Sequence, residues 1–158
     1  MKLYFLRHAD ALDGDDDAVR PLSPHGKNQA RGLARFLQRA EIEFDASYSS
    51  PLVRARQTAE IVLEICGSVE LKITGALLNE TSQSQFEAWL AELPNAKRVL
   101  FVGHAPSLAE RVQQLIGITG SGTLDFPKAG LVCLETEDCR AGKLKFFITP
   151  KLLGVRAD

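Results

Sequence analysis

The chain has 158 residues, of which 45% are hydrophobic and 25% charged, and its 19 basic and 20 acidic residues give a formal net charge of −1. The composition excludes a disordered tail, a coiled coil and a collagen-type repeat, and the length predicts a single domain over residues 1–158. The balanced charge argues against general electrostatic binding to nucleic acid or an anionic membrane, and no apolar run is long enough to cross a bilayer.

The first third of the chain carries a strand signal followed by a helix signal. Lys2–Leu6 is a short apolar run that predicts a strand. A helix is predicted to begin at Ser23 and Pro24, because serine is a favourable N-cap and proline suits the first helical position. Its apolar residues recur at helical spacing and predict one buried stripe, at Ala30, Leu33, Ala34 and Leu37. Between these elements, Asp13–Asp17 lacks the spaced ligands of a calcium-binding loop, and a solvated acidic loop is favoured over a cation site.

The same order of elements follows in the next segment. Ala46–Ser49 predicts a short strand. Ser50 and Pro51 are interpreted as a second N-cap pair, opening a helix that Gly67 ends. Val69–Ile73 alternates apolar and polar residues and predicts a third strand.

Two more helices and a strand are predicted in the middle of the chain. Ser84 and Glu87 have the spacing of a capping box, which opens a helix. Arg98–Val102 predicts a strand buried on both faces. Pro106 opens the following helix, on which Arg111 is expected to face solvent.

The C-terminal part differs from the rest. Gly130–Glu135 and Leu144–Thr149 predict two strands joined by a polar turn, which is a hairpin. Strands and helices alternate up to about residue 117, as is typical of a parallel α/β sheet with helices on both faces. We therefore predict an α/β fold, a three-layer α/β/α sandwich. Its sheet is mixed but mainly parallel, and the C-terminal hairpin adds an antiparallel strand.

Two further features indicate the cellular compartment of the protein. The N-terminus lacks the long apolar region and the cleavage site of a secretory signal. The three cysteines, Cys66, Cys133 and Cys139, are an odd number without metal-ligand spacing and indicate reduced thiols. We therefore expect a cytoplasmic location, and the sequence leaves the oligomeric state open.

Basic side chains follow three of the predicted strands at the point where each strand ends. Arg7 and His8 come after the first strand, Arg54 lies just beyond the second, and His104 follows the fourth. Ligands of parallel α/β sheets bind outside the carboxyl ends of the strands, so these side chains are expected to share one edge. A phosphoryl group suits such an edge. Each guanidinium can bind two phosphoryl oxygens at once, and helix N-termini attract anions.

Two histidines beside a bound phosphoryl group indicate catalysis as well as binding. A neutral imidazole can attack phosphorus and hold the phosphoryl group covalently, while arginines and a second imidazole stabilise the charge of the transition state. These cations remove the need for a metal ion. The sequence has no carboxylate–histidine cluster typical of a metal site, and no cofactor is expected.

Three motifs in the same order resemble the histidine phosphatase superfamily, whose members have the phosphoglycerate-mutase-like fold. They are LRHADA at Leu6–Ala11, SPLVRARQTA at Ser50–Ala59 and VGHAPSL at Val102–Leu108. The resemblance extends over most of the chain, from the first strand to the helix after His104. The segment RPLSPHG at Arg20–Gly26 and the short length resemble the SixA-type phosphohistidine phosphatase branch.

The resemblance implies a role for each of these side chains. His8 matches the nucleophile that takes the phosphoryl group, and Arg7 and Arg54 match the two phosphate-binding arginines. His104 matches the second histidine, which binds phosphate and stabilises the transition state. Arg20 belongs to the segment that marks the branch and is expected to contact either the phosphate or its own loop.

The sequence departs from the superfamily pattern in two places. Ala9 stands where the commoner motif has glycine, and the segment Thr74–Gln83 is short, with Glu80 as its only carboxylate and only candidate general acid. A leaving imidazole needs a positioned acid less than an alkoxide does. The chain is therefore predicted to be a phosphatase acting on phosphohistidine in a signalling or phosphotransfer protein. Two alternatives stay open: a phosphatase for small phosphoesters such as a sugar phosphate or nucleotide, and a non-catalytic module that senses phosphate or binds protein.

Overall fold

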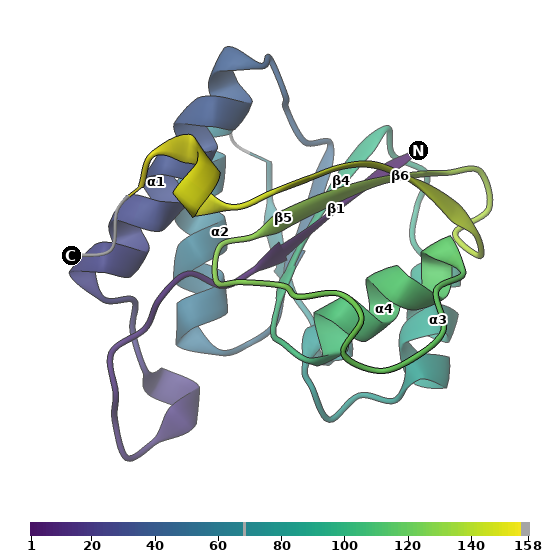
Figure 1. Cartoon of the computed structure of the whole chain (residues 1–158), viewed down its shortest axis with the longest axis horizontal. Helices are drawn as coiled ribbons and strands as arrows, with labels where there is room; N and C mark the ends of the chain where they lie inside the picture. The colour runs from purple at the N-terminus through teal and green to yellow at the C-terminus, as the bar shows by residue number, and fades with distance from the viewer. Residues whose placement is uncertain (68, 156–158) are drawn as a thin grey trace.

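A computed structural model describes residues 1–67 and 69–155 and contains one six-stranded sheet. The strands are β1 (Lys2–Arg7), β2 (Ala46–Ser49), β3 (Leu71–Ile73), β4 (Arg98–Gly103), β5 (Leu131–Thr136) and β6 (Gly142–Ile148). Their order across the sheet is β3-β2-β4-β1-β5-β6, with parallel pairing from β3 to β1 and antiparallel pairing of β1 with β5 and β5 with β6. The mainly parallel sheet with a C-terminal antiparallel hairpin is confirmed (Figure 1).

Helices cover both faces of this sheet and give the expected three layers. They are α1 (Pro24–Arg39), α2 (Val53–Cys66), α3 (Gln83–Ala91) and α4 (Ser107–Ile116), with short 3-10 turns at η1 (Asp17–Val19), η2 (Gly75–Leu77) and η3 (Pro150–Leu153). In Figure 1, α1 and α2 lie on one side of the sheet and α3 and α4 on the other. None of these helices is long and apolar enough to span a bilayer, within the part of the chain that the structure describes.

The strand β1 supplies side chains to both cores by simple alternation. Leu3 and Phe5 pack with the residues of α3 and α4, whereas Tyr4 and Leu6 pack with those of α1 and α2. All four are buried, because successive side chains of a strand point to opposite faces and helices cover each face here. Because β1 is buried on both sides, its carboxyl end is held in a fixed position. The residues that follow the strand are positioned by it.

The segment before α1 is fixed to the loop after β1. The Ser23 hydroxyl accepts the Gly26 N–H at 2.9 Å and Pro24 begins the helix, so the predicted N-terminus of α1 is confirmed. A Cβ at Gly26 would lie 1.9 Å from the carbonyl oxygen of Asp10. Glycine is therefore required where the helix approaches the loop backbone this closely.

Two predicted helix starts are wrong. The helix α2 begins at Val53 rather than at Ser50 and Pro51, because the Ser50 hydroxyl is used by His104 instead of capping a helix. The capping box of α3 is formed by Ser82 and Gln85 rather than Ser84 and Glu87. Both pairs have the same spacing, so the sequence pattern alone does not separate them.

Two smaller expectations also need correction. The third strand is shorter than Val69–Ile73, since β3 spans only Leu71–Ile73 at the edge of the sheet. Arg111 is buried rather than solvent-facing. Its guanidinium donates to the Gln83 side chain at 2.8 Å and to the Thr81 carbonyl, and it lies over the Phe86 ring, so it connects α4 to α3.

Candidate active site

Hydrogen bonds between the ends of β1, β2 and β4 bring the predicted site residues together. The His8 N–H donates to the Gly103 carbonyl at 3.0 Å, and the Ser50 N–H donates to the Val102 carbonyl at 3.1 Å. The rings of His8 and His104 consequently lie with their centroids 5.1 Å apart. Residues from distant parts of the chain thus meet at one edge of the sheet, where the strand ends predicted them.

A single hydrogen bond sets the protonation state of His8. Its Nδ1 lies 2.8 Å from the carbonyl oxygen of Ala9, and a carbonyl can only accept. Nδ1 therefore carries the proton, and in the neutral ring the lone pair is on Nε2. The loop is held in place because the Ala9 N–H donates to the Thr58 hydroxyl at 3.0 Å, which itself donates to the Arg54 carbonyl at 2.7 Å.

Both imidazoles are buried and uncharged at neutral pH. Burial lowers the pKa of His8 to about 3, and the positive charges of Arg54 and Arg7 act in the same direction, against the hydrogen bond to Ala9. Burial and the charge of Arg54 lower the pKa of His104 to about 4. The pair is therefore neutral, and His8 is available as a nucleophile without losing a proton first.

Two guanidinium groups supply the positive charge of the site. Arg7 donates to the Phe126 carbonyl at 2.9 Å, and its Nε is buried without a hydrogen-bond partner among the described residues. Arg54 is 8% exposed and donates to the backbone carbonyl of Asp17 at 2.8 Å. Both arginines lie close enough to His8 to lower its pKa, and a bound anion would neutralise them together.

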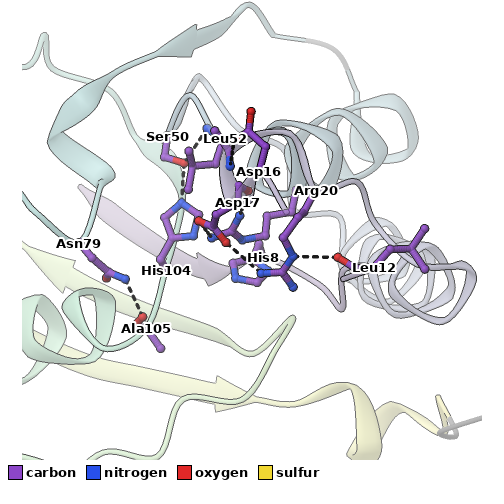
Figure 2. A network of polar contacts seen from close by, with 12 residues as sticks. His8, Leu12, Asp16, Asp17, Arg20, Ser50, Leu52, Asn79, His104 and Ala105 are labelled. Carbon is purple, nitrogen blue, oxygen red and sulfur yellow. Dashed lines mark hydrogen bonds and ion pairs between the residues drawn. The ribbon is translucent and has the colours of Figure 1, made fainter. Parts of the chain in front are cut away.

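The loop after β1 reaches into this site through Asp17. One carboxylate oxygen of Asp17 lies 3.2 Å from the Arg54 guanidinium. The other lies 3.0 Å from the guanidinium of Arg20, which Figure 2 shows beside Asp17. Hydrogen bonds from these two arginines hold the pKa of Asp17 below its usual range. Arg20 also donates to the Leu12 carbonyl at 2.8 Å, so it contacts its own loop.

Sequence reasoning assigned the acidic segment to solvent as a whole. All four aspartates of the segment are exposed, but Asp17 differs from Asp13, Asp15 and Asp16 because its carboxylate is also ion-paired with two arginines. The one available signal was the spacing of three residues between Asp17 and Arg20, which a helical turn brings together.

Polar side chains also fix the loop after β4, which carries His104. The Ser50 hydroxyl lies 2.6 Å from His104 Nε2, and Ser50 is fully buried. Asn79 donates to the Ala105 carbonyl at 2.9 Å and accepts the Ser107 N–H at 3.2 Å. Sequence reasoning missed both contacts, since each joins segments far apart in the chain.

Glu80 follows Asn79 directly but is exposed and has no hydrogen bond or ion pair among the described residues. Its role as a general acid stays a prediction. Over residues 1–67 and 69–155, no group of three or more histidine, cysteine or carboxylate side chains is placed to hold a metal ion.

The Histidine phosphatase superfamily (branch 1) matches residues 3–89, which include β1, α1, β2 and α2. The chain belongs to the histidine phosphatase superfamily. Within it, this histidine phosphatase is of the SixA type. It is 31% identical to the phosphohistidine phosphatase SixA of Escherichia coli K12 over 122 residues, 73% of this chain and 74% of that protein.

Two further proteins are similar to this histidine phosphatase over nearly its whole length. An uncharacterised protein of Picosynechococcus sp. is 37% identical over 147 residues, covering 89% of this chain and 88% of its own length. The structure of the protein histidine phosphatase SixA complexed with tungstate superposes with a TM-score of 0.88 at 26% identity, over 97% of this chain and 99% of that one. The phosphoglycerate-mutase-like fold expected from the motifs is confirmed by this likeness.

Proposed function

We propose that this histidine phosphatase removes phosphoryl groups from phosphohistidine in a protein, through a covalent intermediate on His8. The observation that carries the proposal is the hydrogen bond from His8 Nδ1 to the Ala9 carbonyl. It leaves the Nε2 lone pair free in a neutral ring that lies beside His104 and two guanidinium groups. This is the protonation state that attack on phosphorus requires.

The first step transfers the phosphoryl group to the enzyme. His8 Nε2 forms a bond to phosphorus while the bond between phosphorus and the substrate's imidazole nitrogen breaks, and that nitrogen keeps the electron pair. Arg7 and Arg54 neutralise the charge on the equatorial oxygens, and His104 donates a hydrogen bond to one of them. The Nδ1–H of His8 stays bonded to the Ala9 carbonyl, which stabilises the positive charge of the phosphorylated ring.

The second step returns the enzyme to its starting state. A water oxygen bonds to phosphorus as the Nε2–phosphorus bond breaks, and the electron pair returns to Nε2. Inorganic phosphate leaves, with the protons of the water passing to phosphate and solvent. Neither step needs a metal ion, because the two guanidinium groups supply the positive charge.

The preference for a P–N substrate rests on the weakness of the available acid. An alkoxide must be protonated as it leaves, whereas an imidazole nitrogen is a far weaker base. Glu80 is exposed and is not held toward the site by any hydrogen bond that the structure describes. The similarity to a phosphohistidine phosphatase supports the same substrate class.

Rates on two substrates test the proposal. On a histidine-phosphorylated protein, wild-type enzyme should act at least about 100-fold faster than on an alkyl phosphate, the range that general acid catalysis supplies. Glu80→Gln should leave the phosphohistidine rate unchanged, like the control Glu60→Gln on the exposed face of α2. His8→Ala should abolish that rate.

Two other outcomes would favour the alternatives. Faster hydrolysis of the alkyl phosphate, with a large loss of that rate in Glu80→Gln, would indicate that the substrate is a small phosphoester. Oxyanion binding without any turnover would favour a non-catalytic module.

A further inference from the structure

The side chain of Ser50 makes a direct contact with the second histidine of the site. Its hydroxyl oxygen lies 2.6 Å from His104 Nε2, and both residues are buried. The same oxygen accepts the backbone N–H of Leu52 at 3.3 Å. Since a backbone N–H can only donate, the serine oxygen is the acceptor in this hydrogen bond. The hydrogen of the hydroxyl group therefore needs an acceptor elsewhere.

The hydrogen of the Ser50 hydroxyl has one acceptor among the described contacts, which is His104 Nε2. When the serine donates to Nε2, that nitrogen must carry a lone pair, so the proton of the neutral ring is on Nδ1. The low pKa of His104 agrees with a neutral ring. The hydrogen bonds around Ser50 thus select one of the two neutral forms of His104.

The other ring nitrogen has no partner in the part of the chain that the structure describes. His104 Nδ1 is buried and forms no hydrogen bond there. Buried polar groups are rarely left unpaired, so an N–H donor without a partner marks the position of an acceptor that arrives from outside. Figure 2 shows Ser50 on one side of the His104 ring and His8 and Asp17 on another.

We propose that Ser50 is a positioning residue, which fixes His104 in the Nδ1-protonated neutral form so that it donates to a phosphoryl oxygen. The inference rests on the proposed function and adds that His104 acts as an uncharged donor rather than as a cation or a base. If Nε2 carried the proton instead, Nδ1 would present a lone pair to the phosphoryl oxygens, and the two would repel each other.

The local backbone explains why this serine is available. A Ser-Pro pair usually caps the helix that follows it, as Ser23 does for α1. Here α2 begins only at Val53, and its N-cap, Leu52, makes no side-chain cap hydrogen bond. The N–H of Ser50 is bonded to the Val102 carbonyl on the neighbouring strand β4, which also leads to His104. Ser50 is thus held by the sheet and directed toward the histidine.

The test uses nitrogen NMR of histidine-labelled protein without substrate, where only three histidines give signals. In the wild type, His104 should show a protonated Nδ1 and a hydrogen-bonded, unprotonated Nε2. Ser50→Ala removes the donor, and both neutral forms should then be populated. The matched control is Ser47→Ala. Ser47 is a buried serine on β2, the strand that Ser50 follows, and its hydroxyl donates to the Glu70 carbonyl at 3.0 Å and not to a histidine.

Kinetics supply the second readout. Ser50→Ala should lower kcat at least about tenfold with a small change in KM, because loss of one oriented donor affects the transition state most. Ser47→Ala should leave both values near wild type. An Nε2-protonated His104 in the wild type, or an unchanged tautomer in Ser50→Ala, would overturn the proposal. The NMR result needs no turnover, so it stays readable even if His8→Ala shows that the proposed function is wrong.

Discussion

The carboxylate of Asp17 lies 3.2 Å from the guanidinium of Arg54, so an aspartate of the exposed loop after β1 is ion-paired with an arginine of the candidate active site. In the proposed reaction, the phosphoryl group binds the same guanidinium. The side chain of Asp17 is 64% exposed, so the ion pair is screened by water and is weak enough to rearrange when an oxyanion binds.

Removing the charge of Asp17 should strengthen oxyanion binding. Asp17→Asn keeps an oxygen for Arg54 but takes away a negative charge that opposes the incoming anion. We expect tungstate or inorganic phosphate to bind about fivefold more tightly, equivalent to about 1 kcal/mol for a charge near the surface. Calorimetric titration measures the change, and Asp15→Asn in the same loop, exposed and outside any described ion pair, should leave affinity unchanged. Weaker binding in Asp17→Asn would mean that the carboxylate mainly holds Arg54 in place.

Arg54 should not be replaceable by lysine. Its guanidinium already uses two nitrogens at once, on the carbonyl and the carboxylate of Asp17, and a phosphoryl group requires the same paired geometry. We expect Arg54→Lys to lower kcat/KM about 100-fold, the size of effect seen when an oriented transition-state donor is lost. Arg56→Lys, two residues further along α2 and exposed, is the control and should behave as wild type. Near-wild-type kinetics in Arg54→Lys would remove Arg54 from the phosphate site.

The two buried histidines should make the fold less stable in acid. An unfolded chain takes up protons on histidine near pH 6.5, whereas His8 and His104 in the folded protein resist protonation until about 3 and about 4. Stability should therefore fall as the pH drops below 6.5, by up to about 1.4 kcal/mol per histidine for each pH unit, and level off below the folded pKa values.

Denaturant unfolding between pH 7.5 and 4.5, in buffer free of oxyanions, measures this dependence. His104→Asn lacks one of the two groups and should lose stability less steeply over the same interval. Equal slopes in the two proteins would contradict the assignment, as would histidine resonances that titrate near pH 6.5 for both His8 and His104.

The sequence predicted the parts of the fold that depend on local patterns. The buried runs at β1 and β4 are apolar because helices cover both faces of the sheet, and that composition is visible without any structure. The placement of His8, Arg54 and His104 followed from the same reasoning, because parallel strands end at one edge.

Several of the missed features depend on contacts between distant segments. Ser50 and Pro51 have the residue types of a helix start, and only the position of His104 shows that the hydroxyl serves another partner. Arg111 was expected in solvent, as is usual for a charged side chain. Its helical spacing from Leu108 instead places it on the buried face of α4, where the Phe86 ring and the Gln83 side chain of α3 cover it. Such partners are brought together by packing and leave no local pattern.

Capture of the phosphoenzyme is the decisive experiment for nucleophilic attack by His8. Protein mixed with a phosphohistidine substrate is quenched in base within milliseconds, digested, and the modified peptide identified by mass spectrometry. We predict a base-stable, acid-labile phosphoryl group on His8 in the wild type and none in His8→Ala. A phosphoryl group found on another residue, or steady turnover with His8 never modified, would contradict it.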